Sequence, residues 1–186
     1  MALLEMRDAS YARGGREIVA PFTITLDENE RLAHPCGNDA AASTIALMAA
    51  GLVRPASGRI FIAAFDPRIQ PTQVKRIVGY VPHEALPHDF PSFTRYIEFR
   101  ATLWGLPRAA SIVRARALLA RLDGVHEAFA YPLVGALLSE PRLLVLDRPQ
   151  AAYAPQILDV AGECAIFSTH VLERDAQRFA QEAVPV

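Results

Sequence analysis

The first part of the chain has the apolar and polar pattern of short strands. Residues 3–8 and 22–26 are predicted as strands, the second with alternating apolar and polar residues. Gly14 and Gly15 lie between them and favour a turn. We therefore expect an antiparallel β edge at the start of the fold.

A strand, a loop of small residues and a helix are predicted next. Residues 31–33 form the brief strand, residues 34–42 the loop, and residues 43–52 the helix, with Gly51 near its end. Strand, loop and helix in this order are the topology of a phosphate-binding loop.

The rest of the chain is predicted to combine buried strands with amphipathic helices. Further strands are expected at residues 59–65, 77–81, 142–147 and 165–167. Further helices are expected at residues 92–106 with Ser92 as cap, at 108–122, at 132–138 and finally up to residue 183. The strand at 142–147 has four consecutive apolar residues before an acid, which is typical of a strand buried on both faces of a parallel sheet. The arginines of the second helix are expected to form a solvated face: Arg114, Arg116 and Arg121.

Length, composition and charge restrict the function classes. The 186 residues are 52% hydrophobic and 21% charged, which is typical of one globular domain over 1–186. A net charge of −1 gives no domain-wide positive field, so we expect no nucleic-acid partner. No apolar run of about 18 residues and no export signal occurs, so we expect a cytoplasmic chain without a transmembrane segment. Cys36 and Cys164 lack companions at metal spacing, so neither a zinc site nor a disulfide framework is predicted.

Five strings occur in order along the chain. They are residues 31–44, 49–59, 78–83, 143–149 and 166–170. Together they resemble the nucleotide-binding subunit of an ATP-binding-cassette (ABC) transporter over nearly the whole chain, and residues 93–107 most resemble the cassettes of ABC-2-type exporters. The resemblance implies an α/β, P-loop NTPase-like (RecA-like) fold. Such a fold has a mostly parallel sheet with helices on both faces, an N-terminal antiparallel β edge and, here, a reduced helical subdomain at about 84–131.

The implied phosphate loop keeps its place between a strand and a helix but lacks most of the residues that bind phosphate. A G-x-x-x-x-G-K-[ST] loop uses glycines to turn backbone N–H groups inward, a lysine to neutralise phosphate oxygens and a hydroxyl to hold magnesium. The matching stretch has Cys36 and Ala41 at the outer glycines, Asp39 at the inner glycine and Ala42 at the lysine, with Gly37, Asn38, Ser43 and Thr44 completing it. A carboxylate gained and a lysine lost both act against a bound anion. The alternative is that Ser43 and Thr44 cap the following helix.

The implied metal and catalytic positions are also incomplete. Asp147, at the end of its apolar strand, matches the acid that holds magnesium together with Thr44 if a nucleotide binds. The next position, a catalytic glutamate in the family, is Arg148, which cannot accept a proton. We therefore predict no catalytic residue. The alternative for Asp147 is that it caps a turn.

Four other residues match nucleotide contacts of the family. His83 stands at the Q-loop glutamine, and His170 retains the switch histidine, although a hydrogen-bonded structural role is the alternative for it. Arg13 stands at the adenine-stacking aromatic, with Tyr11 two residues earlier on the same strand face.

The LSGGQ signature of the family does not occur in the chain. It would fall between Tyr131 and Pro132, and the D-loop at residues 151–155 has alanine where the family has aspartate. In the family each ATP lies between the phosphate loop of one subunit and the signature helix of another. The resemblance therefore implies a catalytically impaired cassette, a pseudo-ATPase, for which ATP and magnesium are weak ligands.

Aromatic residues after the Q-loop position supply the remaining hypothesis. In the family this segment receives the membrane subunit, and here it contains Phe90, Phe93, Tyr96 and Trp104. The alternative is that these rings fill the core of the helical subdomain. We predict an accessory or regulatory subunit of an ABC-type membrane transport complex, with an ABC permease and an intact cassette as partners, peripheral to the inner face of the membrane.

Two alternatives stay open. One is a weak ATP-binding or ATP-hydrolysing cassette that uses Asp147, His170 and Thr44 and is completed by a partner's lysine or arginine. The other is a reduced module with no transporter attached.

Overall fold

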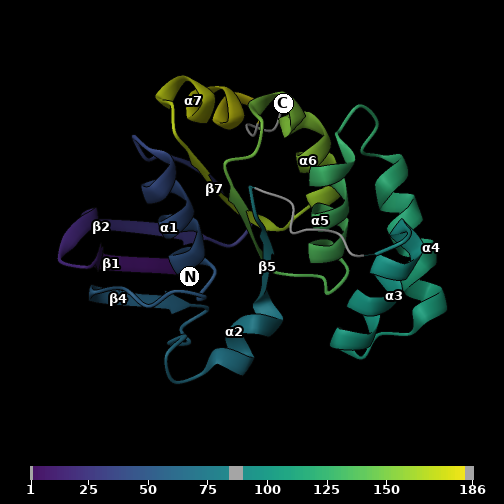
Figure 1. Ribbon diagram of the computed structural model, residues 1–186, viewed down its shortest axis with the longest axis horizontal. Helices are drawn as coiled ribbons and strands as arrows, with labels where there is room; N and C mark the ends of the chain where they lie inside the picture. Colours follow the sequence, from purple (N-terminus) through teal and green to yellow (C-terminus); the bar gives the residue numbers. More distant parts are fainter. Residues whose placement is uncertain (1, 84–89, 183–186) are drawn as a thin grey trace.

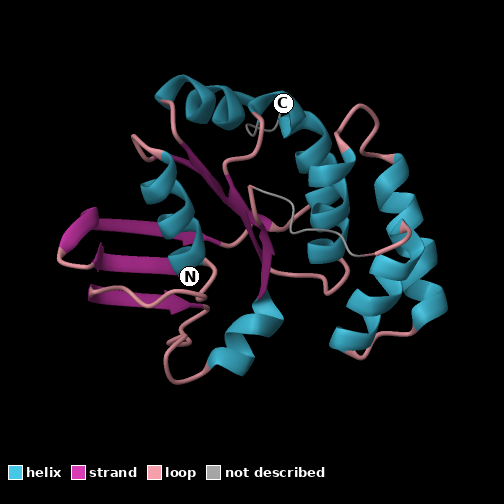
Figure 2. Cartoon of the chain, in the orientation of Figure 1, coloured by secondary structure: helices cyan, strands magenta, loops and turns pink. Residues whose placement is uncertain are grey.

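The strands form two sheets, with helix α1 (Asp39–Ala49) between them (Figures 1 and 2). This computed structural model describes residues 2–83 and 90–182. Because α1 contacts strands of both sheets, its buried residues, such as Ile45 and Met48, join them into one core. The predicted α/β class, with a parallel sheet and an N-terminal antiparallel β edge, is confirmed.

The antiparallel sheet has the strand order β2-β1-β4. Its strands are β1 (Ala2–Arg13), β2 (Arg16–Asp27) and β4 (Ser57–Ile62). Gly14 and Gly15 make the predicted turn, with φ of 57° and 76°. The prediction of short strands at 3–8 and 22–26 was wrong in length, because the backbone ladder continues through polar residues up to the turn.

The parallel sheet has the strand order β3-β7-β6-β5. Its strands are β3 (Arg31–Pro35), β5 (Val78–Val81), β6 (Leu143–Asp147) and β7 (Ala165–His170). Every residue of β6 is buried, as predicted. Leu143 and Val145 pack in the cluster that contains α1, whereas Leu144 and Leu146 pack in the cluster on the opposite face. Helices therefore cover both faces of this sheet.

Helix α1 begins four residues earlier than predicted. Asn38 is its N-cap, and the Asn38 side chain accepts a hydrogen bond from the Ala41 N–H at 2.9 Å. The small residues predicted as loop are mainly alanine, which has the highest helix propensity, so they join the helix once Asn38 caps it. Ser43 and Thr44 therefore lie inside α1, and the alternative that they cap it is wrong.

Three short elements were not predicted: α2 (Pro71–Ile77), the 3₁₀ turn η1 (Ala151–Tyr153) and α6 (Ala154–Ala161). Both α helices carry proline in their first turn, where the missing N–H is not needed. Strand β4 ends at Ile62 rather than at residue 65, because Ala63 and Ala64 adopt φ of 48° and 65° and turn the chain.

The helical region consists of α3 (Phe93–Trp104), α4 (Arg108–Ala120) and α5 (Glu127–Leu137). Helix α5 contacts β5, while α3 and α4 lie on the side away from the sheets (Figure 1). Ser92 caps α3 as predicted, accepting from the Arg95 N–H at 3.3 Å. Helix α5 begins five residues before the predicted start and runs without a break through Pro132. Residues 84–89 of the expected helical subdomain lie outside the described residues.

The predicted basic face of α4 is exposed but partly paired. Arg121 Nε lies 2.8 Å from Asp159 Oδ2, and Arg114 pairs with Glu140, whereas Arg116 is simply exposed.

Helix α7 (Glu173–Glu182) packs on β3 and β7 through Ala176 and Phe179. Within residues 2–83 and 90–182, no helix combines the length and apolarity needed to cross a bilayer.

Candidate functional site

The carboxyl ends of three parallel strands bring the predicted site residues to one edge of the sheet. The last ladder positions pair Asp147 with Thr169 and Pro35 with His170. The loop that leads into α1 follows Pro35 directly, and Arg148 follows Asp147. Ligand sites of open α/β sheets lie at this edge.

Arg148 is the centre of this site. Its guanidinium donates through Nε to Asp147 Oδ1 at 3.1 Å and through Nη2 to Ser43 Oγ at 2.9 Å, and it also pairs with the carboxylate of Asp39. Burial disfavours the charged guanidinium, but the hydrogen bonds to Asp147 and Asp39 outweigh this and raise the pKa of Arg148. One cation therefore joins the first two turns of α1 to the end of β6.

The backbone of Arg148 is fixed as firmly as its side chain. Its φ of 50° lies in the left-handed region, which costs free energy for a side chain of this size. The Arg148 N–H donates to the Thr169 carbonyl at 3.1 Å, and the Arg148 carbonyl accepts from His83 Nδ1 at 3.1 Å. Because a carbonyl only accepts, His83 carries its proton on Nδ1.

Both carboxylate oxygens of Asp147 are engaged inside the protein. Oδ1 accepts from Arg148, and Oδ2 accepts from Ser43 Oγ at 2.7 Å. The Asp147 residue is 3% exposed. The alternative that Asp147 merely caps a turn does not describe these contacts, which cross from β6 to α1.

The two hydroxyls that matched a magnesium ligand point in different directions. Ser43 Oγ meets Asp147, whereas Thr44 Oγ1 donates to the carbonyl of Ala40, one turn earlier in its own helix, at 2.6 Å. Arg148, Asp147, Asp39 and Ser43 form what we call the Arg148 cluster. Of the pair expected to hold magnesium, Thr44 and Asp147, only Asp147 belongs to it.

The backbone and side chain of the loop from Cys36 to Asn38 form hydrogen bonds to other groups of the protein. The Cys36 N–H donates to the His170 carbonyl at 2.8 Å, and Gly37 adopts φ of 74°. The N–H groups of Ala41 and Ala42 both donate to Asn38, to its side chain and its carbonyl respectively. Ala42, at the lysine position of the family, is fully buried.

His170 faces the interior. Its Nε2 lies 3.0 Å from Ser168 Oγ, and its ring lies 5.4 Å from that of Phe179. Burial lowers the pKa of His170 to about 4, so the ring is neutral at physiological pH. His170 nevertheless borders, with Asp39, His83 and Arg148, a cavity of about 370 Å³.

The two residues matched to adenine stacking lie on the β1–β2 hairpin. Tyr11 is half-buried at the margin of the core, and Arg13 is exposed beside the turn. Neither has a hydrogen bond or ring contact with the phosphate loop within the described ranges.

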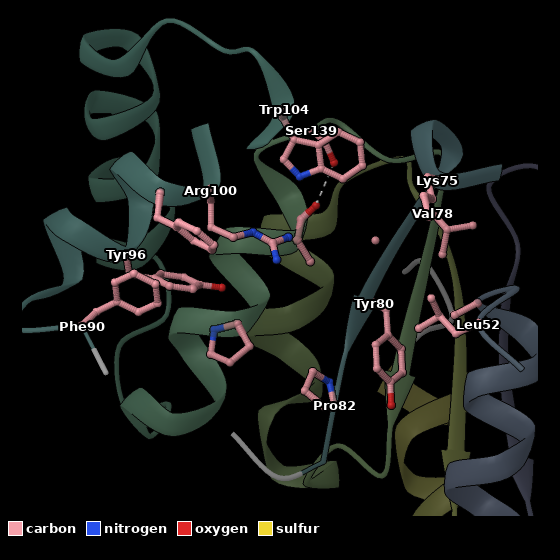
Figure 3. Close-up of a pocket in the computed structure, with 15 residues that line it drawn as sticks. Leu52, Lys75, Val78, Tyr80, Pro82, Phe90, Tyr96, Arg100, Trp104 and Ser139 are labelled. Carbon is pink, nitrogen blue, oxygen red and sulfur yellow. Dashed lines mark hydrogen bonds between the residues drawn. The ribbon is translucent and has the colours of Figure 1, made fainter. Parts of the chain in front are cut away.

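A second cavity, of about 520 Å³, is lined by residues of β5, α3 and α5 (Figure 3). We call it the β5–α3 groove. Its walls include Phe90, Tyr96, Phe99, Trp104, Tyr80 and Leu52, with Lys75 and Arg100 as its charged residues. Phe99 and Leu52 are about half exposed.

Three of the four aromatic residues predicted for a partner surface line this groove, and Phe93 does not. Phe93 borders a different cavity, where its ring lies 4.6 Å from that of Tyr131. Phe93 and Trp104 occupy opposite ends of α3, about 16 Å apart along the helix axis. Phe93 therefore lies outside this groove, whereas Phe90 and Tyr96 border both cavities.

Sequence reasoning missed the bonds of Arg148 and the presence of Phe99, Arg100 and Lys75 in the groove. A signal for the first was available: Asp39 and Arg148 are opposite charges at two positions that the resemblance places around one phosphate group. Among residues 2–83 and 90–182, no group of three or more His, Cys, Asp or Glu side chains is arranged to hold a metal ion.

The sheet order, the position of α1 and the site at the strand ends define the fold as that of ABC ATPases, a class of P-loop NTPases. No family model matches the chain. A solved structure described as the ATP-binding subunit of an ABC transporter superimposes with a TM-score of 0.75 at 23% identity, covering 95% of this chain and 82% of that one.

Curated relatives of the chain are ABC transporter ATP-binding proteins. The chain is 28% identical over 191 residues to the uncharacterized ABC transporter ATP-binding protein YxlF of Bacillus subtilis, covering 90% of this chain. It is 26% identical over 196 residues to the linearmycin resistance ATP-binding protein LnrL of the same organism, covering 92% of this chain. The chain spans 62% of the length of each of these relatives.

Proposed function

We propose that this protein is a catalytically impaired ABC-transporter ATP-binding-cassette-like subunit that acts through protein contacts in a membrane transport complex. Its partners are an ABC permease and, in a mixed dimer, an intact cassette, and it lies at the inner face of the membrane. The similarity of residues 93–107 to ABC-2-type exporter cassettes favours an export complex. The observation that carries the proposal is the β5–α3 groove.

The groove supports protein contact because the described residues that line it combine two exposed apolar side chains with a single sign of charge. Phe99 is 47% exposed and Leu52 is 54% exposed, values that are unfavourable for a face in permanent contact with water. Lys75 and Arg100 are the only charged residues among the described residues that line it. An amphipathic helix of the permease that carries a carboxylate fits this combination.

The Arg148 cluster supports the loss of catalysis. A general base is missing at position 148, because a guanidinium accepts no proton. The residues present also do not fit magnesium with a triphosphate. The Asp147 carboxylate is already bonded to Ser43 and Arg148, the Asn38 side chain occupies an N–H of the phosphate loop, and Asp39 adds negative charge there.

The absent LSGGQ string extends this reasoning to a dimer. Where the family carries the string, helix α5 runs unbroken past Tyr131 and Pro132. In a head-to-tail dimer, this chain offers no signature to the nucleotide of its partner. The rival function, a weak ATPase completed by a partner's lysine or arginine, requires Arg148 to leave Asp147.

Association with a permease tests the proposal. An ABC-2-type permease is expressed with the wild-type chain or with a groove variant that introduces a carboxylate, Phe99→Asp, and the detergent-solubilised complex is isolated through the permease. Val113→Asp is the matched control, because Val113 is 70% exposed on α4 and lies outside the groove. We expect the wild type and Val113→Asp to copurify and Phe99→Asp to be lost.

Equal copurification of the two variants would contradict the role of the groove. Hydrolysis of ATP by the isolated complex that disappears with Asp147→Ala in this chain would favour the rival ATPase.

A further inference from the structure

The Arg148 cluster is an oxygen site that already contains its cation. Three side chains present oxygen atoms to one guanidinium: a carboxylate oxygen of Asp147, a carboxylate oxygen of Asp39 and the hydroxyl of Ser43. They come from β6, from the first turn of α1 and from the second turn of α1. Carboxylates and hydroxyls are hard ligands of the kind that divalent cations such as Mg²⁺ and Mn²⁺ prefer.

Burial makes the cation indispensable to this cluster. The side chain of Asp147 is 5% exposed and that of Arg148 is 17% exposed, whereas that of Asp39 is 76% exposed. A carboxylate as buried as Asp147 is strongly destabilising unless an opposite charge compensates it. The Ser43 hydroxyl donates to Asp147 and accepts from Arg148, so it needs both partners to keep its two bonds.

We propose that the Arg148 guanidinium is the resident cation of this cluster, taking the place of a divalent metal ion, so that the site is complete without metal or nucleotide. Arg148 is then a positioning residue that holds the end of β6 against α1. Removal of its charge converts Asp147, Asp39 and Ser43 into a site for Mg²⁺ or Mn²⁺. The inference concerns the isolated chain and holds whether or not a permease binds the groove.

Manganese binding to the purified chain tests the inference. Free Mn²⁺ is measured by electron paramagnetic resonance. Thermal unfolding is recorded in MnCl₂ or MgCl₂ up to about 10 mM, a concentration at which a weak metal site still raises Tm. We compare the wild type with Arg148→Ala and with Arg121→Ala, which removes an exposed arginine from its pair with Asp159.

For the wild type and for Arg121→Ala, we expect no saturable Mn²⁺ binding and no metal-dependent change of Tm. Without metal, Arg148→Ala should unfold at a Tm lower by on the order of 5–10 °C, because it leaves Asp147 uncompensated. It should bind one Mn²⁺ saturably at these concentrations, where the wild type does not, and its Tm should rise with the logarithm of the Mn²⁺ concentration. The double variant Arg148→Ala/Asp147→Asn should lose this response.

A conservative variant keeps the test decisive if Arg148→Ala folds poorly. Arg148→Lys retains the positive charge but not the planar guanidinium that reaches three groups. Its Tm should therefore lie between those of the wild type and Arg148→Ala, and it should not bind Mn²⁺. Equal Mn²⁺ affinity in the wild type and Arg148→Ala would overturn the inference. A metal response of Arg148→Lys as large as that of Arg148→Ala would also overturn it.

Discussion

The ring of Tyr96 in α3 occupies the space beside Gly135 in α5 that any larger side chain would need. A Cβ atom on Gly135 would lie 2.9 Å from Tyr96 Cζ and closer still to the hydroxyl. Arg100, one turn after Tyr96, donates to the Gly135 carbonyl at 3.0 Å. Close approach of α3 and α5 therefore depends on a residue without a side chain.

Gly135→Ala should destabilise the protein although alanine favours helices. The intrinsic gain is about 1 kcal/mol, whereas forcing an extra methyl into a packed contact costs about 1–3 kcal/mol. We expect a net loss of stability in urea unfolding. In the background Tyr96→Phe, which removes the nearest atom, the cost of Gly135→Ala should be smaller. A double-mutant cycle with no coupling between the two positions would contradict this account.

Asn38→Ala should lower the free energy of unfolding by about 1 kcal/mol, because it removes the acceptor for the Ala41 N–H at the start of α1. Asn38→Asp should retain most of the stability, since its carboxylate also accepts this bond. Chemical denaturation of the three proteins provides the measurement. A loss on Thr44→Ala as large as that on Asn38→Ala would mean that the helix is stabilised from within rather than by its cap.

Stability should fall as the pH is lowered below about 6.5, in part because of His170. Burial holds its pKa at about 4 in the folded protein, with Asp175 acting in the opposite direction, whereas an unfolded histidine has a pKa of about 6.5. The unfolded chain therefore binds more protons between these values. This group contributes stability fully above pH 6.5, and up to about 3 kcal/mol is lost on acidification to pH 4.

Urea unfolding between pH 5 and pH 8 tests the role of His170. His170→Gln should have a flatter dependence of stability on pH than the wild type. The comparison isolates His170 from His34, whose pKa burial also lowers. Parallel curves for the two proteins would show that His170 is not the group responsible.

Both cysteines should resist alkylation in the folded state. Burial raises the pKa of Cys36 to about 11 and that of Cys164 to about 12, so little thiolate forms at pH 8. Their reaction with iodoacetamide, followed by mass spectrometry, should be at least about a hundredfold slower than in urea. Rapid labelling of Cys36 without denaturant would mean that the phosphate loop opens in solution.

An element of the fold could be predicted wherever its pattern of apolar and polar residues is compatible with only one secondary structure. The run Leu143 to Asp147 is too apolar for anything but a strand covered on both faces, and β6 has this environment. Residues 39–42 had two interpretations, because small residues suit both a flexible loop and a helix. The cap at Asn38 decided between them, and its effect depends on local geometry that composition does not contain.

The candidate site could be predicted by position but not by contact. The resemblance placed Asp39, Ser43, Asp147 and Arg148 around one phosphate group, and the structure brings these four together. That Arg148 would bond to the other three depends on the direction of one long side chain across two elements. Such a direction follows from tertiary packing rather than from spacing along the chain.

The strand order has a consequence for the synthesis of the protein. In the parallel sheet β3 is bonded to β7, so Arg31 pairs with Ile166, near the other end of the described chain. The β1–β2 hairpin folds from local contacts, but β3 leaves the ribosome on the order of ten seconds before its partner at usual rates of translation. During that interval β3 is an unpaired strand, which favours aggregation, and the parallel sheet closes only after β7 has been made.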